Sequence, residues 1–186
     1  MTQRTQDRGR PARGDGSGPE GAAMSEPPVV IERAGPADAG ELTTVQRAAY
    51  VAEAQLYGDP FLPPLVESVE QLRKVLETDA VVLKAVLDGR LVGAVRAQFS
   101  DHTCLVGRLV VVPDLQGRGI GRRLLAELEG EVAGRVDACV LFTGHLSESN
   151  LRLYRRLGYS ETHRERVAAH LTLVHMRKPL VPAGTG

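Results

Sequence analysis

The feature of this sequence that most constrains its fold is a glycine-rich segment, residues 113–125, which joins an apolar run to an amphipathic stretch. The preceding residues 109–112, Leu-Val-Val-Val, are typical of a strand. After the glycines, leucine and valine recur at three- and four-residue steps, which predicts a helix. Such a junction points several backbone N–H groups, and the positive end of the helix dipole, at one place. Because glycines let an anion approach the backbone closely, the segment predicts a phosphate-binding site.

Two widespread phosphate-binding motifs fit the segment poorly. A Walker loop closes with Gly-Lys-Ser/Thr, and no lysine occurs between Lys84 and Lys178. A Rossmann fingerprint is Gly-x-Gly-x-x-Gly in the first strand–helix unit, with an acidic residue about 20 residues later. Here the glycines are Gly117, Gly119 and Gly121, and they lie in the middle of the chain. This spacing disfavours a nucleotide-binding oxidoreductase, which stays open as an alternative.

A different pattern fits both the glycines and their flanks. Residues 116–121, Gln-Gly-Arg-Gly-Ile-Gly, follow Pro113 by three residues and precede a Leu-Leu pair. The segment resembles the Q/R-x-x-G-x-G/A signature of the GNAT superfamily of acyl-CoA N-acyltransferases. Residues 150–159, Asn-Leu-Arg-Leu-Tyr-Arg-Arg-Leu-Gly-Tyr, resemble the N-x-x-L-Y-x-x-x-G-Y/F block of the same family. The resemblance covers about residues 29–178 and is sharpest over 105–159.

Periodicity and turn signals predict the order of the elements. Asp88-Gly89 indicates a two-residue hairpin turn, and Ser68 with Gln71 indicates a capping box. Residues 58–64 read as a proline-rich loop, and Ser147 or Ser149 as a helix N-cap. We expect strands at about 29–31, 80–87, 91–99, 104–112, 138–143, 160–166 and 170–178, and helices at about 36–56, 69–76, 119–132 and 149–157. The strands at 104–112 and 138–143 flank a helix, so they should be parallel. The expected α/β (α+β) fold is a mixed, mostly antiparallel sheet of six to seven strands flanked by about four helices, as the GNAT resemblance implies. The resemblance further implies that the parallel pair splays apart around coenzyme A.

The resemblance implies that coenzyme A is the cosubstrate and that the backbone of this chain holds it. In the family the pyrophosphate lies at the glycine-rich turn and the pantetheine between the splayed strands, where the Val111 N–H matches the usual oxyanion donor. Asn150 matches a coenzyme A contact, although many relatives carry their asparagine earlier, where this chain has Ser147. The implied coenzyme A-binding residues are Leu109, Val110, Val111, Gln116, Gly117, Arg118, Gly119, Ile120, Gly121, Arg122 and Asn150.

Acyl transfer from a thioester to an amine requires protonation of the departing thiolate. Tyr154 matches the tyrosine that acts as the general acid in many GNAT relatives, and a phenol is protonated at neutral pH. The acceptor side carries a weaker signal. Glu53 and Tyr57, near the end of the first expected helix, are the expected substrate contacts, because a carboxylate there can bind an ammonium group or take its proton through water. The histidines and cysteines show no metal-ligand spacing, so we expect no metal.

Composition sets the broad class of the protein. The chain has 186 residues, 42% hydrophobic and 25% charged, which suits one globular domain. Its net charge of zero gives no indication of nucleic-acid or membrane partners, and no apolar run reaches the ~18 residues of a membrane span. Two cysteines in apolar stretches indicate buried thiols in a reducing compartment, so we expect a cytoplasmic protein. We expect a disordered tail at 1–28, the catalytic domain at 29–178 and a flexible tail at 179–186.

Together these features predict a GNAT-like N-acetyltransferase that moves an acetyl group from acetyl-CoA to a primary amine by direct attack in a ternary complex. The amine would belong to a small molecule or a peptide. A homodimer is a further expectation, because the last strands often pair between subunits in the family that the chain resembles. The alternative is a non-catalytic acyl-CoA sensor or partner-binding module on the same fold, which would bind acetyl-CoA without releasing a thiol.

Overall fold

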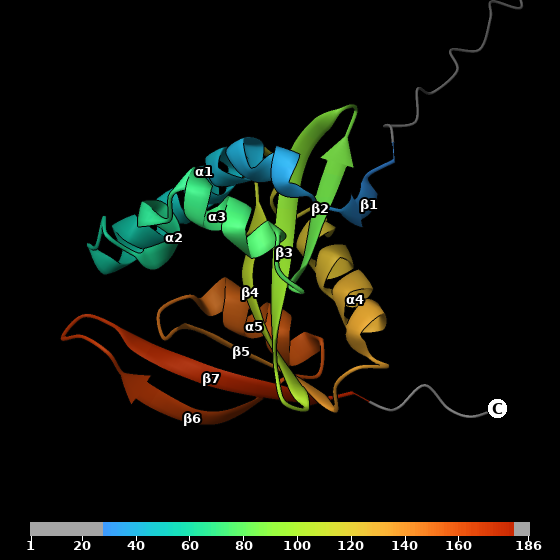
Figure 1. Cartoon of the computed structure of the whole chain (residues 1–186). Coiled ribbons are helices and arrows are strands. Elements are labelled where there is room, and N and C mark those ends of the chain that lie inside the picture. The colour runs from blue at the N-terminus through green and yellow to red at the C-terminus, as the bar shows by residue number, and fades with distance from the viewer. Residues whose placement is uncertain (1–27, 181–186) are drawn as a thin grey trace, which may run out of the picture.

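A seven-stranded sheet forms the centre of the computed structural model, which describes residues 28–180 (Figure 1). The strands are β1 (Val30–Arg33), β2 (Val81–Leu87), β3 (Arg90–Ser100), β4 (Thr103–Val111), β5 (Ala138–Gly144), β6 (Ser160–Arg166) and β7 (Thr172–Pro179). Their order across the sheet is β1-β2-β3-β4-β5-β7-β6. Of these neighbouring pairs, β4 and β5 are parallel and the others antiparallel. The mixed, mostly antiparallel sheet predicted from the sequence is therefore confirmed.

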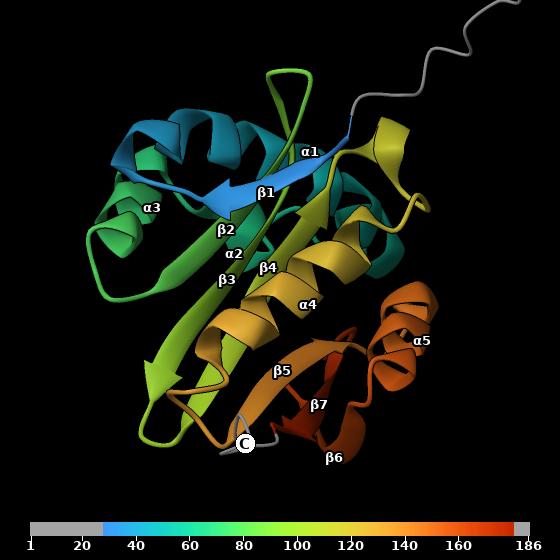
Figure 2. The same ribbon diagram turned by 90° about the vertical axis from the view of Figure 1, so that its right-hand side faces the viewer.

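Helices cover both faces of this sheet. They are α1 (Ala39–Tyr57), α2 (Pro63–Val66), α3 (Val69–Leu76), α4 (Ile120–Val132) and α5 (Glu148–Arg156), with short 3₁₀ turns at Pro36–Asp38 and Pro113–Leu115. Figures 1 and 2 show α1 and α3 on one face of β2, β3 and β4, and α4 on the other. The short helix α2 lies where the sequence suggested only a proline-rich loop. Its first two residues are Pro63 and Pro64, positions at which the missing N–H of proline does no harm to a helix.

Local signals in the sequence set several boundaries. Asp88 and Gly89 both have positive φ, 50° and 75°, as the predicted two-residue turn between β2 and β3 requires. At the start of α3, Ser68 Oγ accepts the N–H of Gln71 at 3.1 Å, and Gln71 Oε1 accepts the N–H of Ser68 at 2.8 Å. This reciprocal pair is the predicted capping box. Gly158 follows α5 with φ 92°, where only glycine is free of strain.

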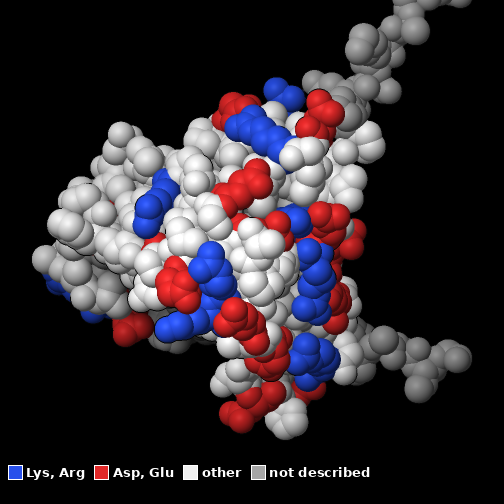
Figure 3. All heavy atoms as spheres, turned by 45° about the horizontal axis from the view of Figure 1, so that its top comes forward, with Lys and Arg blue, Asp and Glu red and all other residues white. Residues whose placement is uncertain are grey.

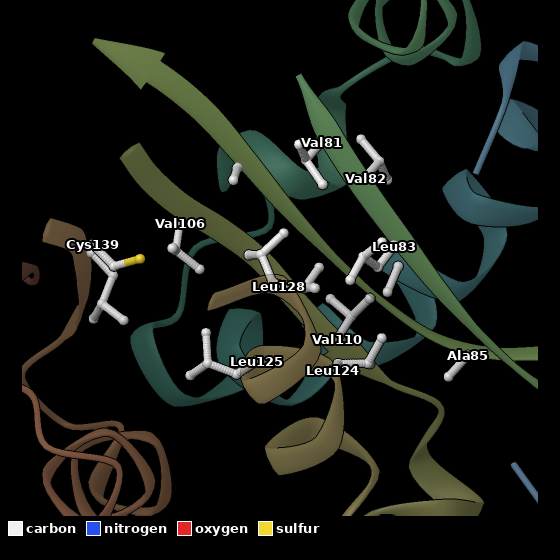
Figure 4. Close-up of a cluster of buried hydrophobic side chains, with 14 of the residues drawn as sticks. Val81, Val82, Leu83, Ala85, Val106, Val110, Leu124, Leu125, Leu128 and Cys139 are labelled. Carbon is white, nitrogen blue, oxygen red and sulfur yellow. The ribbon is translucent and has the colours of Figure 1, made fainter. Parts of the chain in front are cut away.

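Packing of α4 against the sheet supplies much of the core. Leu124, Leu125 and Leu128 are fully buried and project from α4 toward the sheet, where Val106 and Val110 of β4 lie (Figure 4). Burying each leucine stabilises the fold by roughly 1.5–3 kcal/mol. The two cysteines, Cys104 and Cys139, are fully buried free thiols opposite each other on β4 and β5, which confirms that they are buried.

The predicted tails at 1–28 and 179–186 fall almost wholly outside the described residues, but β7 runs to Pro179 and the Leu180 N–H donates to Asp137 O at 2.8 Å. Within residues 28–180, every helix is too short or too polar to cross a membrane. Acidic and basic side chains are interspersed on the face drawn in Figure 3.

Candidate active site

The sheet opens between β4 and β5. The two strands pair only from Thr103 to Leu105 of β4, although both continue well beyond that point, and Figure 2 shows them diverging. The register between β3 and β4 shifts between Ala94 and Arg96, where Arg108 has a positive φ of 53°. A bulge of this kind bends the strand that carries it. The predicted splay of the parallel pair is therefore confirmed, and it has a local cause in β4.

The backbone of β4 beyond the bulge presents hydrogen-bonding groups to this opening. The Val112 N–H donates to Val92 O of β3 at 2.9 Å. Because successive residues of a strand direct their N–H groups to opposite sides, the Val111 N–H points away from β3, toward the side of β5. The same alternation directs the backbone of Leu109 into the opening. Val110 instead pairs with Ala94 of β3 and is 5% exposed, so it serves the sheet and the core.

The glycine-rich turn lies directly after this strand. Gly117 and Gly119 have positive φ, 78° and 81°, and a Cβ added at either would meet no atom within 4 Å. Within the described chain, no residue accepts the backbone N–H groups of residues 119–122 at the start of α4. The Gln116 side chain links the turn to the strand, because its Nε2 donates a hydrogen bond to Val111 O at 3.0 Å. An open turn with unclaimed N–H groups at a helix N-terminus is suited to hold a phosphate.

The predicted acid, Tyr154, lies on α5; the residue is 8% exposed and its ring is in edge contact with Tyr159. Burial raises the pKa of Tyr154 above its ordinary value, and the nearby Tyr50 and Glu53 raise it further. The phenol therefore stays protonated over the physiological range. Asn150, one turn earlier on the same helix, is half-buried, and its side chain makes no hydrogen bond to another described residue.

The two expected substrate contacts lie against the loop between β5 and α5. The Tyr57 hydroxyl accepts the Leu146 N–H at 2.8 Å and lies 3.2 Å from Ser147 Oγ, which donates to Glu53 Oε2 at 2.7 Å. Ser147 is the residue preceding α5, as expected of a helix cap, but its hydroxyl serves this network instead of the helix. Glu53 and Tyr57 thus join the end of α1 to the base of α5, and their contact with an acceptor stays a prediction.

A polar cluster lies beneath α1, and its two arginines were not expected from the sequence. Glu67 accepts from Gln46 Nε2 at 2.8 Å and from Arg96 Nη1 at 3.2 Å, and Arg108 Nε lies 3.7 Å from its carboxylate. Burial alone would raise the pKa of Glu67, but Gln46 and the two arginines outweigh it and hold that pKa below its ordinary value. Burial lowers the pKa of Arg96. The negative charge of Glu67 raises this pKa in part, and the positive charge of Arg108 lowers it further.

Tyr50 connects this cluster to the rest of the site. Burial raises the pKa of Tyr50; the charges of Arg108 and Arg96 lower this pKa in part, and the charges of Glu53 and Glu67 raise it. The signal for the cluster was present in the sequence as two arginines inside apolar strand runs. Tyr50 and Glu53 in turn raise the pKa of Tyr154, so an electrostatic influence extends from Arg108 at the bulge, through Tyr50, to Tyr154.

Comparisons with known proteins identify this arrangement. The family model described as an acetyltransferase (GNAT) domain matches residues 49–180. The UPF0157 protein YqkA of Bacillus subtilis is 29% identical over 137 residues, which cover 73% of this chain and 38% of that protein. The chain thus spans well under half of that relative.

Solved structures share the fold. The ribosomal-protein-S18-alanine N-acetyltransferase of Escherichia coli superimposes with a TM-score of 0.71 at 19% identity, over 85% of this chain and 97% of the other. The PaiA N-acetyltransferase of Thermoplasma acidophilum, solved in complex with coenzyme A, gives a TM-score of 0.67 at 19% identity, over 82% and 99%. The domain match covers most of the chain and includes the bulge, the glycine-rich turn and α5. This protein belongs to the GNAT acetyltransferase family.

Proposed function

We propose that this protein transfers an acetyl group from acetyl-CoA to a primary amine by direct attack in a ternary complex. The observation that carries the proposal is the Val111 N–H, which faces the opening between β4 and β5 beside the unclaimed N–H groups of the glycine-rich turn. Acetyl-CoA would supply the acyl group in activated form, as a thioester. The PaiA structure, which holds coenzyme A, supports the choice of carrier by its likeness in fold.

Backbone groups of two segments would bind acetyl-CoA. The N–H groups of residues 119–122 would hold the pyrophosphate, with the exposed side chain of Arg122 adding positive charge. Leu109 and Val111 would hold the pantetheine arm with strand-like hydrogen bonds. Val111 N–H would also donate to the carbonyl oxygen as negative charge develops on it, and the loss of one such donor typically costs about 3–4 kcal/mol of transition-state stabilisation.

Proton movements would involve α1 and α5. The amine attacks the carbonyl carbon, the C–S bond breaks, and the Tyr154 hydroxyl gives its proton to the departing sulfur. Tyr154 is suited to this role because burial keeps its phenol protonated and the same burial makes a thiolate more basic. Glu53 would take the surplus proton of the amine through a water molecule, since its Oε1 makes no hydrogen bond within residues 28–180 while Oε2 accepts from Ser147.

The test is a thiol-release assay with acetyl-CoA and a broad panel of amines, on wild-type protein and Tyr154→Phe. We expect Tyr154→Phe to lower turnover tenfold or more with little change in coenzyme A affinity, because only the transition state uses the hydroxyl proton. Tyr159→Phe is the matched control, because the Tyr159 hydroxyl donates to Glu129 of α4 and has no part in the mechanism. Unchanged turnover in Tyr154→Phe would remove Tyr154 from the mechanism. Acetyl-CoA binding without thiol release from any amine would favour the non-catalytic sensor.

A further inference from the structure

We infer that the acceptor is a zwitterion, an amine that also carries a carboxylate, and that Arg108 binds this carboxylate. The inference rests on the proposed function and specifies the substrate class of the same site. It is carried by three properties of Arg108: a buried Nε without a hydrogen-bond acceptor among residues 28–180, membership of a cluster with one surplus positive charge, and a strained backbone at the bulge of β4.

The first property is an unmet hydrogen bond. Arg108 Nε is a buried side-chain donor that finds no acceptor among the described residues. Glu67 Oε2, at 3.7 Å, lies beyond hydrogen-bonding distance, because Gln46 and Arg96 hold that carboxylate in place. A buried donor without an acceptor is unfavourable, and folded proteins retain few such groups. A substrate carboxylate would supply the hydrogen-bond acceptor that this cluster lacks.

The second property is a surplus of positive charge. Arg96 and Arg108 bring two guanidinium groups to the cluster, and Glu67 brings one carboxylate, which leaves one positive charge. A single carboxylate balances that surplus, whereas a phosphate monoester, with a charge of about −1.5 to −2, exceeds it. A guanidinium also presents two parallel N–H groups that match the two oxygens of a carboxylate. The charge of the cluster therefore favours a carboxylate over a phosphate.

The third property is the position of Arg108. Its side chain is 22% exposed, against 9% for Arg96 and 13% for Glu67, so it is the member of the cluster that an incoming molecule reaches most easily. The residue adopts a positive φ of 53° at the bulge, three residues before Val111. Non-glycine residues in this conformation are strained, and such strain concentrates at functional sites. The bulge directs this guanidinium toward Glu67 and Tyr50, on the side of the sheet that α1 covers (Figure 1).

Glu53 supplies the negative charge nearest to this cluster on α1. It lies three residues after Tyr50 on the same face of that helix, both Glu53 and Arg108 influence the pKa of Tyr50, and no ion pair joins Glu53 to Arg108 within residues 28–180. A zwitterion with its ammonium group toward Glu53 and its carboxylate toward Arg108 would therefore meet a complementary charge at each end. The structure assigns amino-acid-like molecules as acceptors on this ground, in place of amines that carry only positive charge.

The experiment compares acceptors that differ only in the anionic group. Each of a set of L-amino acids is assayed against its own α-carboxamide, and O-phosphoethanolamine is assayed against ethanolamine, with acetyl-CoA held at saturation. For the preferred pair we expect wild-type kcat/KM to be at least about tenfold higher for the acid than for the amide. Equal values for acids and amides, or a preference for the phosphate over every carboxylate, would overturn the inference.

Three variants locate the effect. Arg108→Gln should raise KM for the acid about tenfold or more, leave KM for acetyl-CoA unchanged, and treat acid and amide alike. Arg108→Lys should keep part of the preference, because an ammonium group retains the charge and loses the paired N–H geometry. Arg73→Gln, which removes an exposed arginine of α3 paired with Glu70, should behave as wild type. If Arg108→Gln lowered kcat/KM by the same factor for the acid and for the amide, the role of Arg108 would be merely structural.

A binding measurement separates this inference from the proposed function. The same acids and amides are titrated by calorimetry into wild-type protein and Arg108→Gln in the presence of coenzyme A. Binding of the acid that the substitution removes would support the carboxylate subsite even if no thiol were released. If thiol were released equally from amines with and without a carboxylate, the proposed function would stand and the carboxylate subsite would be refuted. Melting of each variant by circular dichroism confirms that it folds.

Discussion

Replacing Arg108 by methionine should make the protein more stable. Arg108 carries the surplus positive charge of a half-buried cluster, and its buried Nε finds no hydrogen-bond acceptor among residues 28–180. Methionine has a similar length and fills irregular space well, and it brings no charge. After the substitution, Glu67 still accepts from Gln46 and Arg96, so the remaining pair is balanced.

The expected magnitude follows from opposing contributions. Loss of the attraction between Arg108 and Glu67 at 3.7 Å removes about 4 kcal/mol at an effective dielectric constant of about 20. Relief of the repulsion from Arg96, together with the several kcal/mol that dehydration of a guanidinium costs, offsets this loss. Removal of the unpaired donor, worth about 1–3 kcal/mol, then decides the sign. We expect a net stabilisation of about 1–2 kcal/mol, or roughly 3–6 °C in melting temperature.

The assay is chemical denaturation of wild-type protein, Arg108→Met and Glu67→Gln. Glu67→Gln is the matched opposite, because it leaves two positive charges without a counterion and should destabilise the protein by about 3–5 kcal/mol. Arg108→Met should gain stability while its preference for carboxylate-bearing acceptors disappears. A loss of more than about 1 kcal/mol in Arg108→Met would refute the reasoning, because Arg108 would then be a structural partner of Glu67.

Two further predictions concern stability. Gly144→Ala should lower the free energy of unfolding, measured by denaturation, by about 3 kcal/mol or more. The new Cβ would overlap the buried Tyr57 hydroxyl and break the hydrogen bond that this hydroxyl accepts from the Leu146 N–H. An unchanged free energy of unfolding would contradict the packing of Tyr57 on Gly144. The pKa of Glu67 is lower in the folded protein than in the unfolded chain, so its contribution to stability is complete above the unfolded value of about 4.3 and is lost as the pH falls through the folded value. The difference in unfolding free energy between wild-type protein and Glu67→Gln should therefore shrink on acidification, and a difference independent of pH would count against the ionised cluster.

The fold could be predicted largely because its signals are local. The Asp88–Gly89 turn and the Ser68 capping box lie within a few residues of the elements that they delimit. The glycine-rich turn likewise combines strand, turn and helix in one continuous segment. Such features express backbone preferences that do not depend on distant residues.

The acceptor side of the site could not be predicted in the same way. Gln46, Glu67, Arg96 and Arg108 come from α1, the link between α2 and α3, β3 and β4, and only the folded sheet brings them together. An arginine in an apolar strand indicates a buried charge, but the sequence does not reveal its partner. The hydrogen bonds of the Tyr57 hydroxyl to the loop before α5 could not be predicted either, because they join residues 90 positions apart; its contact with an acceptor stays a prediction.

Calorimetric titration of the wild-type protein with coenzyme A tests the central claim most directly. The open N–H groups of residues 119–122 and the Val111 N–H predict saturable one-to-one binding at micromolar concentrations. Gly119→Ala, which forces a side chain into a backbone with φ of 81°, should bind clearly more weakly. Wild-type protein that binds no coenzyme A at millimolar concentrations would contradict the account.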